Sequence, residues 1–275
     1  MELSIDLLKQ IAINVFDAIH PILGTKKAAE KTQRGAGGDI SMQIDLIAEN
    51  VVIDSLENAN VNLLLISEEI GEKYIGNKEK AIKSQNVLII DPIDGSNNAV
   101  RGIPYCSISI AYAIGRKIND IKKAVILDLN TKDIYWAIEG EGAYLNNNEI
   151  HVSDLNITDK CFFELNLPMK NFFKHIDNLR PIFRRFFRIR VLGSSALTLC
   201  QLAKGSMEAF INLRETNRLV DVAAGILILK EAGGEIFSLT GSKIEGDLSI
   251  YLKFPFIASN NKLVSFLKNK LSSNY

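Results

Sequence analysis

Residues 91–98 read DPIDGSNN, and this stretch places two carboxylates, Asp91 and Asp94, three positions apart. The apolar run 87–90 leads directly into it and is typical of a short buried strand. The two acids therefore lie where a strand ends and the chain turns. Pro92 fixes its own φ and has no N–H, which stiffens the turn between the acids.

The residues that follow the acids, Gly95 and Ser96, indicate the start of a helix with free backbone N–H groups. Acids that hold a hard cation, beside a helix start that holds an anion, suit a metal-bridged phosphate. For this segment alone an ordinary turn is the alternative, because Asp and Gly are the default turn residues.

A second acidic segment lies upstream. The run 63–66, Leu-Leu-Leu-Ile, indicates another short buried strand, and it leads through Ser67 into Glu68 and Glu69. Adjacent acids at the end of a buried strand repel each other, and a cation would relieve that cost. Taken alone, the segment could equally begin a solvated loop.

A third acidic position lies far downstream. Residues 219–234 are apolar around almost their whole circumference, which predicts a buried helix ended by the glycine pair 233–234. We place Asp221 in the first turn of this helix, where the macrodipole tolerates a negative charge. That position alone could explain the acid, but a carboxylate that opens a buried helix has to face something polar.

Together these segments resemble the inositol monophosphatase family, within the superfamily of lithium-sensitive, magnesium-dependent sugar phosphatases. The matching segments follow the family's order along nearly the whole chain: 39–45, 68–69, 91–97, 190–196, 220–225 and 231–234. The resemblance implies an α/β fold, the layered α-β-α-β-α sandwich of that superfamily. It also implies an archaeal-type enzyme with both inositol monophosphatase and fructose-1,6-bisphosphatase activity.

The chain alternates helical and strand-like segments without an internal repeat. We expect helices at 3–23, 44–56, 176–186, 194–203, 219–232 and from 260 onward, and strands at 63–66, 87–90, 106–114, 124–129, 134–138, 162–165, 209–213 and 256–258. We expect an N-terminal metal-binding α+β half, residues 1–146, and a C-terminal α/β substrate half, residues 147–275, within one compact unit. The segment 26–38, rich in Lys, Gly and Ala, is either a lid over the site or a plain flexible loop.

The resemblance implies a magnesium centre with two ions per subunit. One ion would bind Glu68, Asp91 and the main-chain carbonyl of Ile93. The other would bind Asp91, Asp94 and Asp221, with Asp91 bridging the two. The family also leaves room for a third, weaker ion near Glu68 and Glu69. These are the oxygen ligands that magnesium prefers.

The resemblance further implies the groups that handle the phosphate. The phosphate would lie on the N–H groups of Gly95 and Ser96, next to Asp94. Ser96, hydrogen-bonded to Asp45, would orient the attacking water together with Glu68. Most family members carry Thr where this chain has Ser96, and a Ser hydroxyl can make the same hydrogen bonds with a less fixed rotamer.

The substrate side is expected from the second half. By resemblance, Gly193, Ser194 and Ser195 would contact the sugar hydroxyls. Arg190 and Arg214 could pair with a second phosphate, since guanidinium groups suit phosphate oxygens. That pairing favours fructose 1,6-bisphosphate beside inositol 1-phosphate. The alternative places both arginines in surface ion pairs.

The composition excludes several classes of protein. Lys plus Arg and Asp plus Glu both number 32, so no overall field favours nucleic acid or a membrane surface. No apolar run approaches membrane-spanning length, and the acids near residue 2 do not suit a secretion signal. The three scattered cysteines suit buried free thiols in a reducing compartment. We therefore expect a cytoplasmic protein, and the family implies a homodimer.

The sequence thus predicts a magnesium-dependent phosphatase that hydrolyses inositol and sugar phosphate monoesters by in-line attack of a metal-activated water. One alternative is a 3′-phosphoadenosine 5′-phosphate phosphatase, which would need a base-stacking aromatic pair that the sequence does not obviously offer. Another is a non-catalytic protein of the same fold that binds a macromolecular partner. Intact acids at all four positions argue against that last class.

Overall fold

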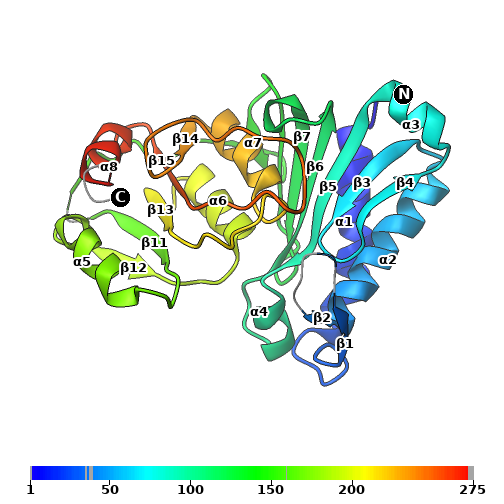
Figure 1. The fold of residues 1–275 in the computed structure, drawn as a ribbon, viewed down its shortest axis with the longest axis horizontal. Coiled ribbons are helices and arrows are strands. Elements are labelled where there is room, and N and C mark those ends of the chain that lie inside the picture. The colour runs from blue at the N-terminus through cyan, green and yellow to red at the C-terminus, as the bar shows by residue number, and fades with distance from the viewer. Residues whose placement is uncertain (1, 35, 37–39, 159, 272–275) are drawn as a thin grey trace.

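The computed structural model describes residues 2–34, 36, 40–158 and 160–271. In that part of the chain, two large β-sheets and eight α-helices are stacked in layers (Figure 1). The larger sheet has eight strands in the spatial order β10 (Asn148–Ile150), β9 (Ala143–Leu145), β8 (Ile134–Ile138), β7 (Ile121–Asp128), β6 (Ser107–Ile114), β5 (Asn86–Asp94), β3 (Leu63–Ser67) and β4 (Gly71–Ile75). The smaller sheet has five, in the order β12 (Arg188–Arg190), β11 (Phe162–Asn166), β13 (Ala209–Asn212), β15 (Phe256–Asn260) and β14 (Gly234–Phe237). A separate ribbon pairs β1 (Lys31–Arg34) with β2 (Ile40–Met42).

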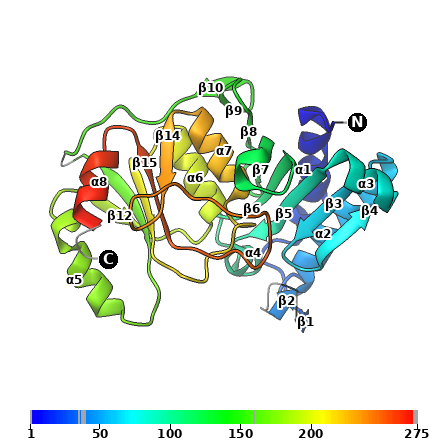
Figure 2. The ribbon, with the colours of Figure 1, turned by 45° about the horizontal axis from the view of Figure 1, so that its top comes forward.

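The helices form the other layers. They are α1 (Ile5–Ile19), α2 (Gln43–Asn58), α3 (Lys78–Ser84), α4 (Ser96–Arg101), α5 (Phe172–Phe183), α6 (Ser195–Ala203), α7 (Ala223–Glu231) and α8 (Val264–Leu271). Helices α1 and α2 cover the outer face of the large sheet, α6 and α7 lie between the sheets, and α5 and α8 cover the outer face of the small sheet (Figures 1 and 2). The predicted α-β-α-β-α sandwich is therefore confirmed.

Each pair of neighbouring layers has its own apolar core. One core joins the two sheets through α6 and α7, a second joins α1 and α2 to the large sheet, and a third lies under α5 and α8. Helix α1 shows how the sequence builds these contacts. Its buried residues Leu8, Ile11, Val15 and Ile19 recur every three or four positions, and the Ser4 hydroxyl accepts a hydrogen bond from Leu7 N at the helix start.

The direction of two strands in the large sheet positions the acids. Strands β3 and β5 run parallel, whereas the other neighbouring strands of this sheet are antiparallel. Parallel neighbours end at the same edge of a sheet, so Glu68, which follows β3, comes beside Asp91 and Asp94 at the end of β5. All nine residues of β5 are buried, as its apolar sequence predicts.

One sequence-based placement is wrong. We predicted Asp221 in the first turn of a helix that begins at 219, but α7 begins at Ala223 with Val222 as its N-cap. Asp221 therefore precedes the helix. The uninterrupted apolar run on both sides of Asp221 hides this boundary, because buried loop and buried helix have the same composition here.

The division of the chain at residues 146 and 147 stays a prediction. The large sheet continues to Ile150, and the core between the sheets takes side chains from both halves. The predicted free thiols are present, since Cys106, Cys161 and Cys200 are all buried and unpaired. Among the described helices, none combines the length and apolar character needed to cross a bilayer.

Candidate active site

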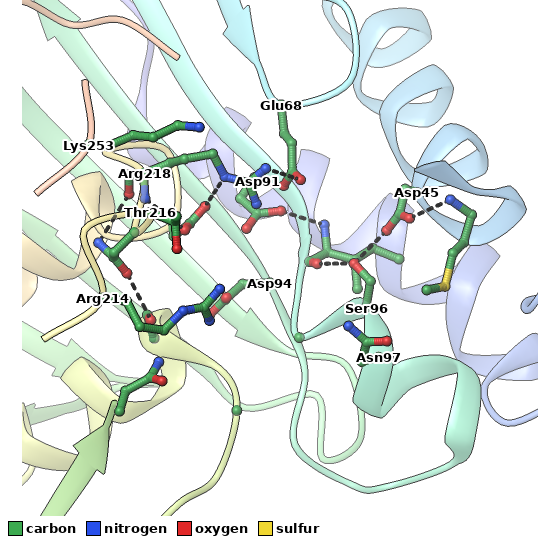
Figure 3. Close-up of a pocket in the computed structure, with 18 of the residues that line it drawn as sticks. Asp45, Glu68, Asp91, Asp94, Ser96, Asn97, Arg214, Thr216, Arg218 and Lys253 are labelled. Atoms are coloured by element: carbon green, nitrogen blue, oxygen red, sulfur yellow. Dashed lines mark hydrogen bonds and ion pairs between the residues drawn. The ribbon is translucent and has the colours of Figure 1, made fainter. Parts of the chain in front are cut away.

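Three carboxylates from separate parts of the chain converge in one cavity. One oxygen each from Glu68, Asp91 and Asp221 lies within 4.8 Å of the other two. Figure 3 shows Glu68 and Asp91 pointing toward Arg218 from different elements. The cavity has a volume of about 600 Å³ and is also lined by Asp94.

Asp94 lies beside the three converging carboxylates, but its own hydrogen bonds go to another part of the chain. Its carboxylate is buried, and Oδ2 accepts hydrogen bonds from Ser194 Oγ and Ala196 N, both at 2.6 Å. These donors lie at the start of α6, in the other half of the chain. Asp94 thus links the end of β5 to the layer between the sheets.

Burial perturbs all four acids. Removal from water raises the pKa of Glu68 to about 8 and that of Asp94 to about 7, and neighbouring carboxylates add to both shifts. Burial also raises the pKa of Asp91 well above its ordinary value, and it raises that of Asp221. A cluster of hard oxygen donors that is costly to ionise without a cation fits a divalent metal such as magnesium.

Arg218 is the cation that the structure places among these acids. Its Nη1 lies 2.5 Å from Glu68 Oε1, and its Nε lies 3.2 Å from Asp221 Oδ1. Its backbone N–H also donates to Asp221 Oδ2 at 3.1 Å. The guanidinium charge lowers the pKa of both carboxyls, against the larger effect of burial. Sequence reasoning missed Arg218, although it lies three residues before a predicted ligand.

A hydroxyl and a carboxylate pair on another wall of the cavity. Ser96 Oγ lies 2.8 Å from Asp45 Oδ1 and 2.8 Å from Ile93 O, so its single proton can go to either acceptor. Asp45 Oδ2 accepts a hydrogen bond from Met42 N, which fixes the carboxylate in the first turn of α2. The predicted pairing of Ser96 with Asp45 thus has the geometry of a hydrogen bond, and both residues line the cavity.

Two glycine turns meet beside α4. Gly95 is the N-cap of α4 at φ +91°, and a Cβ there would lie 2.9 Å from Tyr105 O and 3.3 Å from Gly193 O. Gly193 has φ +89°, and its own Cβ would meet the Asn98 amide at 3.0 Å. Asn98 Nδ2 donates to Tyr105 O and to Leu192 O, each at 2.8 Å, and so ties the two turns together. Only residues without a Cβ allow this close approach.

The structure separates the predicted sugar contacts. Gly193 and Ser195 line the cavity. Ser194 is buried, its hydroxyl donates to Asp94, and it accepts a hydrogen bond from Leu197 N as the cap of α6. The Ser194 hydroxyl therefore already donates and accepts hydrogen bonds within the protein. Ser195 Oγ donates weakly to Asn217 Oδ1, at 3.4 Å.

The two predicted phosphate-binding arginines do not come together. Arg214 is exposed and lines the cavity (Figure 3). Arg190 lies outside the lining, with its guanidinium 4.8 Å from the ring centre of Phe162 and a hydrogen bond to Ile189 O. Lys253 also lines the cavity and was not predicted. Its signal in the sequence is weak, because it is a lone lysine in a loop.

Two buried glutamates that sequence reasoning missed hold the site's loops. Glu49 lies one helical turn after Asp45, and its Oε1 accepts hydrogen bonds from Ser67 Oγ and from Ile70 N. Glu49 therefore accepts hydrogen bonds from both sides of the turn that carries Glu68 and holds this turn in place. The spacing of four residues from Asp45 on one helix was the available signal.

Glu164 is the second buried glutamate, and it holds loops of the site in the C-terminal half of the chain. It interrupts an apolar strand, β11, and is buried. It accepts hydrogen bonds from Leu192 N at 3.1 Å and from Thr198 Oγ at 2.8 Å. An acid inside an apolar strand pattern is the signal that could have found it.

The predicted match at 39–45 begins with Asp39, which lies outside the described residues. The predicted lid, 26–38, is described only in part. Within it, Ala36 N donates a 2.7 Å hydrogen bond to Glu69 O, so this segment reaches the acidic turn after β3.

The layered fold and the acid-lined cavity together define the sugar phosphatase class that the sequence predicted. Residues 2–271 match the sequence model of the inositol monophosphatase family, and the chain belongs to that family. Members of this family are generally metal-dependent, which agrees with the cluster of carboxylates.

Known proteins resemble the chain over most of its length. It is 35% identical to the fructose-1,6-bisphosphatase/inositol-1-monophosphatase of Methanothermobacter thermautotrophicus, over 92% of this chain and 90% of that protein. It is 36% identical to the bifunctional NADP phosphatase/NAD kinase of Methanococcus maripaludis over 97% of this chain, but it spans only about half (49%) of that relative's length. A solved inositol monophosphatase–fructose 1,6-bisphosphatase superposes with a TM-score of 0.83 at 30% identity, over 97% of this chain and 98% of that one.

Proposed function

We propose that this protein is a magnesium-dependent phosphatase that hydrolyses inositol 1-phosphate and fructose 1,6-bisphosphate. The observation that carries the proposal is the convergence of Glu68, Asp91 and Asp221 in one cavity, with Asp94 beside them. These four acids, with the carbonyl of Ile93, would hold two ions per subunit. Magnesium bound there would lower the pKa of a water and stabilise the charge that develops on the phosphate.

The chain's own residues would supply the remaining chemistry. Ser96, held between Asp45 and the Ile93 carbonyl, can accept a hydrogen bond from water while it donates its own proton in a hydrogen bond to Asp45. The N–H groups of Gly95 and Ser96 would bind phosphate oxygens. A glycine at position 95 supports this arrangement, since it lets the start of α4 pack against the backbone of Tyr105 and Gly193, which a Cβ would prevent.

Two cations support a substrate with a second phosphate. Arg214 and Lys253 both line the cavity and are exposed, and neither has an ion-pair partner among the residues that the structure describes. Guanidinium and ammonium groups facing a cavity favour anionic substrates. Fructose 1,6-bisphosphate would use this charge more fully than inositol 1-phosphate. A role for Arg190 stays a sequence-based prediction.

A substrate panel tests the proposal. Purified protein is assayed for phosphate release with magnesium and with EDTA, on inositol 1-phosphate and fructose 1,6-bisphosphate, as kcat/KM. We expect release to stop in EDTA and return with magnesium. If neither ester is hydrolysed under any metal condition, the proposed activity is wrong.

A second candidate is an NADP phosphatase, because relatives of that description are as similar as the sugar phosphatases. The pyrophosphate of NADP could also use Arg214 and Lys253. However, no aromatic side chain is found among the described residues that line the cavity, so nothing there would stack on adenine. The same reasoning disfavours 3′-phosphoadenosine 5′-phosphate. Both nucleotides belong in the panel, and a preference for either would replace the sugar phosphates.

The proposal also covers the oligomeric state, the cellular location and the sensitivity to lithium. We propose a homodimer in the cytoplasm that is sensitive to lithium, as the family resemblance implies. Light scattering during size-exclusion chromatography measures the mass of the assembly, and a lithium titration of phosphate release measures the inhibition.

A further inference from the structure

Arg218 lies among the converging acids of the cavity and pairs with two of them. Two of the three converging carboxylates, Glu68 and Asp221, are its ion-pair partners, at 2.5 and 3.2 Å. The Arg218 side chain is only 14% exposed, so these contacts are made away from bulk solvent. Figure 3 shows the guanidinium reaching between Glu68 and Asp91.

The three cationic side chains that line the cavity differ in whether they form ion pairs. Arg214 and Lys253 also line it, but they are exposed and make no ion pair within the described residues. Arg218 alone of the three is paired with predicted metal ligands. The position of its charge therefore bears directly on whether a metal can bind.

We infer that Arg218 is an internal cation that competes with the metal for Glu68 and Asp221. A guanidinium and a divalent ion repel each other at contact distance, so both cannot use these carboxylates together. Metal binding is then an exchange in which the guanidinium withdraws. The inference rests on the metal dependence proposed above.

The backbone supports such an exchange. The N–H of Arg218 donates to Asp221 Oδ2 independently of the side chain. Withdrawal of the guanidinium would leave Asp221 oriented by this bond and free Oδ1 and Glu68 Oε1 for a metal. In the metal-free protein the pairing offsets repulsion among buried carboxylates, which would otherwise destabilise the fold.

The competing interpretation makes Arg218 a support that orients the metal ligands. The two interpretations predict opposite changes in metal affinity when the Arg218 side chain is removed. Removing a competitor tightens metal binding, whereas removing a support weakens it.

The experiment measures Mn²⁺ binding without substrate, by isothermal titration calorimetry, in the wild-type protein, Arg218→Gln and Lys253→Gln. The last variant loses the same charge from the same cavity without breaking an ion pair to a ligand. We expect Arg218→Gln to bind Mn²⁺ about tenfold more tightly, and Lys253→Gln to change much less. We also expect Arg218→Gln to lower the Tm in EDTA and to widen the gain in Tm on adding Mn²⁺.

Equal or weaker Mn²⁺ affinity in Arg218→Gln would overturn the inference. Failure of the wild-type protein to bind Mn²⁺ would instead count against the proposed metal dependence itself, so the two failures are distinguishable. If Arg218→Gln does not fold, a crystal structure of the wild-type protein with Mn²⁺ decides the matter. Arg218 should then be separated from Glu68, and an intact ion pair beside a bound ion would refute competition.

Discussion

Asp94 Oδ2 accepts a 2.6 Å hydrogen bond from Ser194 Oγ, although the two residues lie 100 positions apart in the chain. The same oxygen accepts a bond of equal length from Ala196 N, in the first turn of α6. Hydrogen bonds to an ionised carboxylate are stronger than neutral ones. One predicted metal ligand thus also holds the layer between the sheets against the end of β5.

Ser194→Ala should therefore weaken both the fold and the site. The change removes the cap of α6 and one of the two donors to buried Asp94, for a loss of about 1–3 kcal/mol in the free energy of unfolding. Urea denaturation measures it. The neighbouring Ser195→Ala loses only a long bond to Asn217 and should cost less. Equal losses in the two variants would show that neither the cap nor the bond to Asp94 contributes to stability.

Glu49 should be needed to position Glu68. Glu49→Ala removes the shared acceptor of Ser67 Oγ and Ile70 N, so we expect weaker magnesium binding and a loss of about 1–3 kcal/mol in stability. The magnesium concentration that gives half-maximal activity measures the first effect. Glu49→Gln keeps an acceptor oxygen and should retain most of the affinity. If the alanine variant bound magnesium normally, Glu49 would have a structural role only.

The sequence predicted much of this arrangement because the acids end apolar strands. Runs such as 63–66 and 87–90 are too apolar to be anything but buried, so Glu68 and Asp91 had to appear at strand ends. The order of the layers could not be predicted from these patterns, because periodicity does not say which face of a sheet a helix covers. That prediction came from the family resemblance.

The errors and omissions concern features that tertiary contacts decide. Asp221 was placed inside a helix because the apolar run around it has no break. Arg190 and Arg214 look equivalent in the sequence, but β12 directs Arg190 onto Phe162 and away from the cavity. The commitment of Ser194 to Asp94 depends on a partner in the other half, which no local pattern reveals.

The metal-free protein should lose stability as the pH rises. Burial raises the pKa of Glu68 to about 8 and of Asp94 to about 7, from ordinary values of 4.5 and 3.8. Between the ordinary and raised values the folded state binds more protons than the unfolded state, so the stability falls as the pH increases. This contribution is complete below about pH 4 and is lost as the pH passes through 7 and 8.

Thermal melting in EDTA at several pH values between 5 and 9 measures this dependence. Magnesium should flatten it, because the ion takes the place of the protons on the carboxylates. Metal affinity should rise over the same range. A Tm in EDTA that rose toward pH 8 would mean that these carboxyls are ionised at low pH, against their burial.

Arg214 and Arg190 give the sharpest test of substrate choice, because sequence and structure disagree about them. Their sequence-based pairing on a second phosphate predicts equal losses from Arg214→Ala and Arg190→Ala. The geometry, with Arg214 in the cavity lining and Arg190 on Phe162, predicts a loss at Arg214 alone. We expect Arg214→Ala to lower kcat/KM for fructose 1,6-bisphosphate about 10- to 100-fold, and for inositol 1-phosphate far less, since only the first carries a second phosphate. A loss of equal size on both substrates would place Arg214 at the reacting phosphate, and equal losses in both variants would mean that β12 moves when substrate binds.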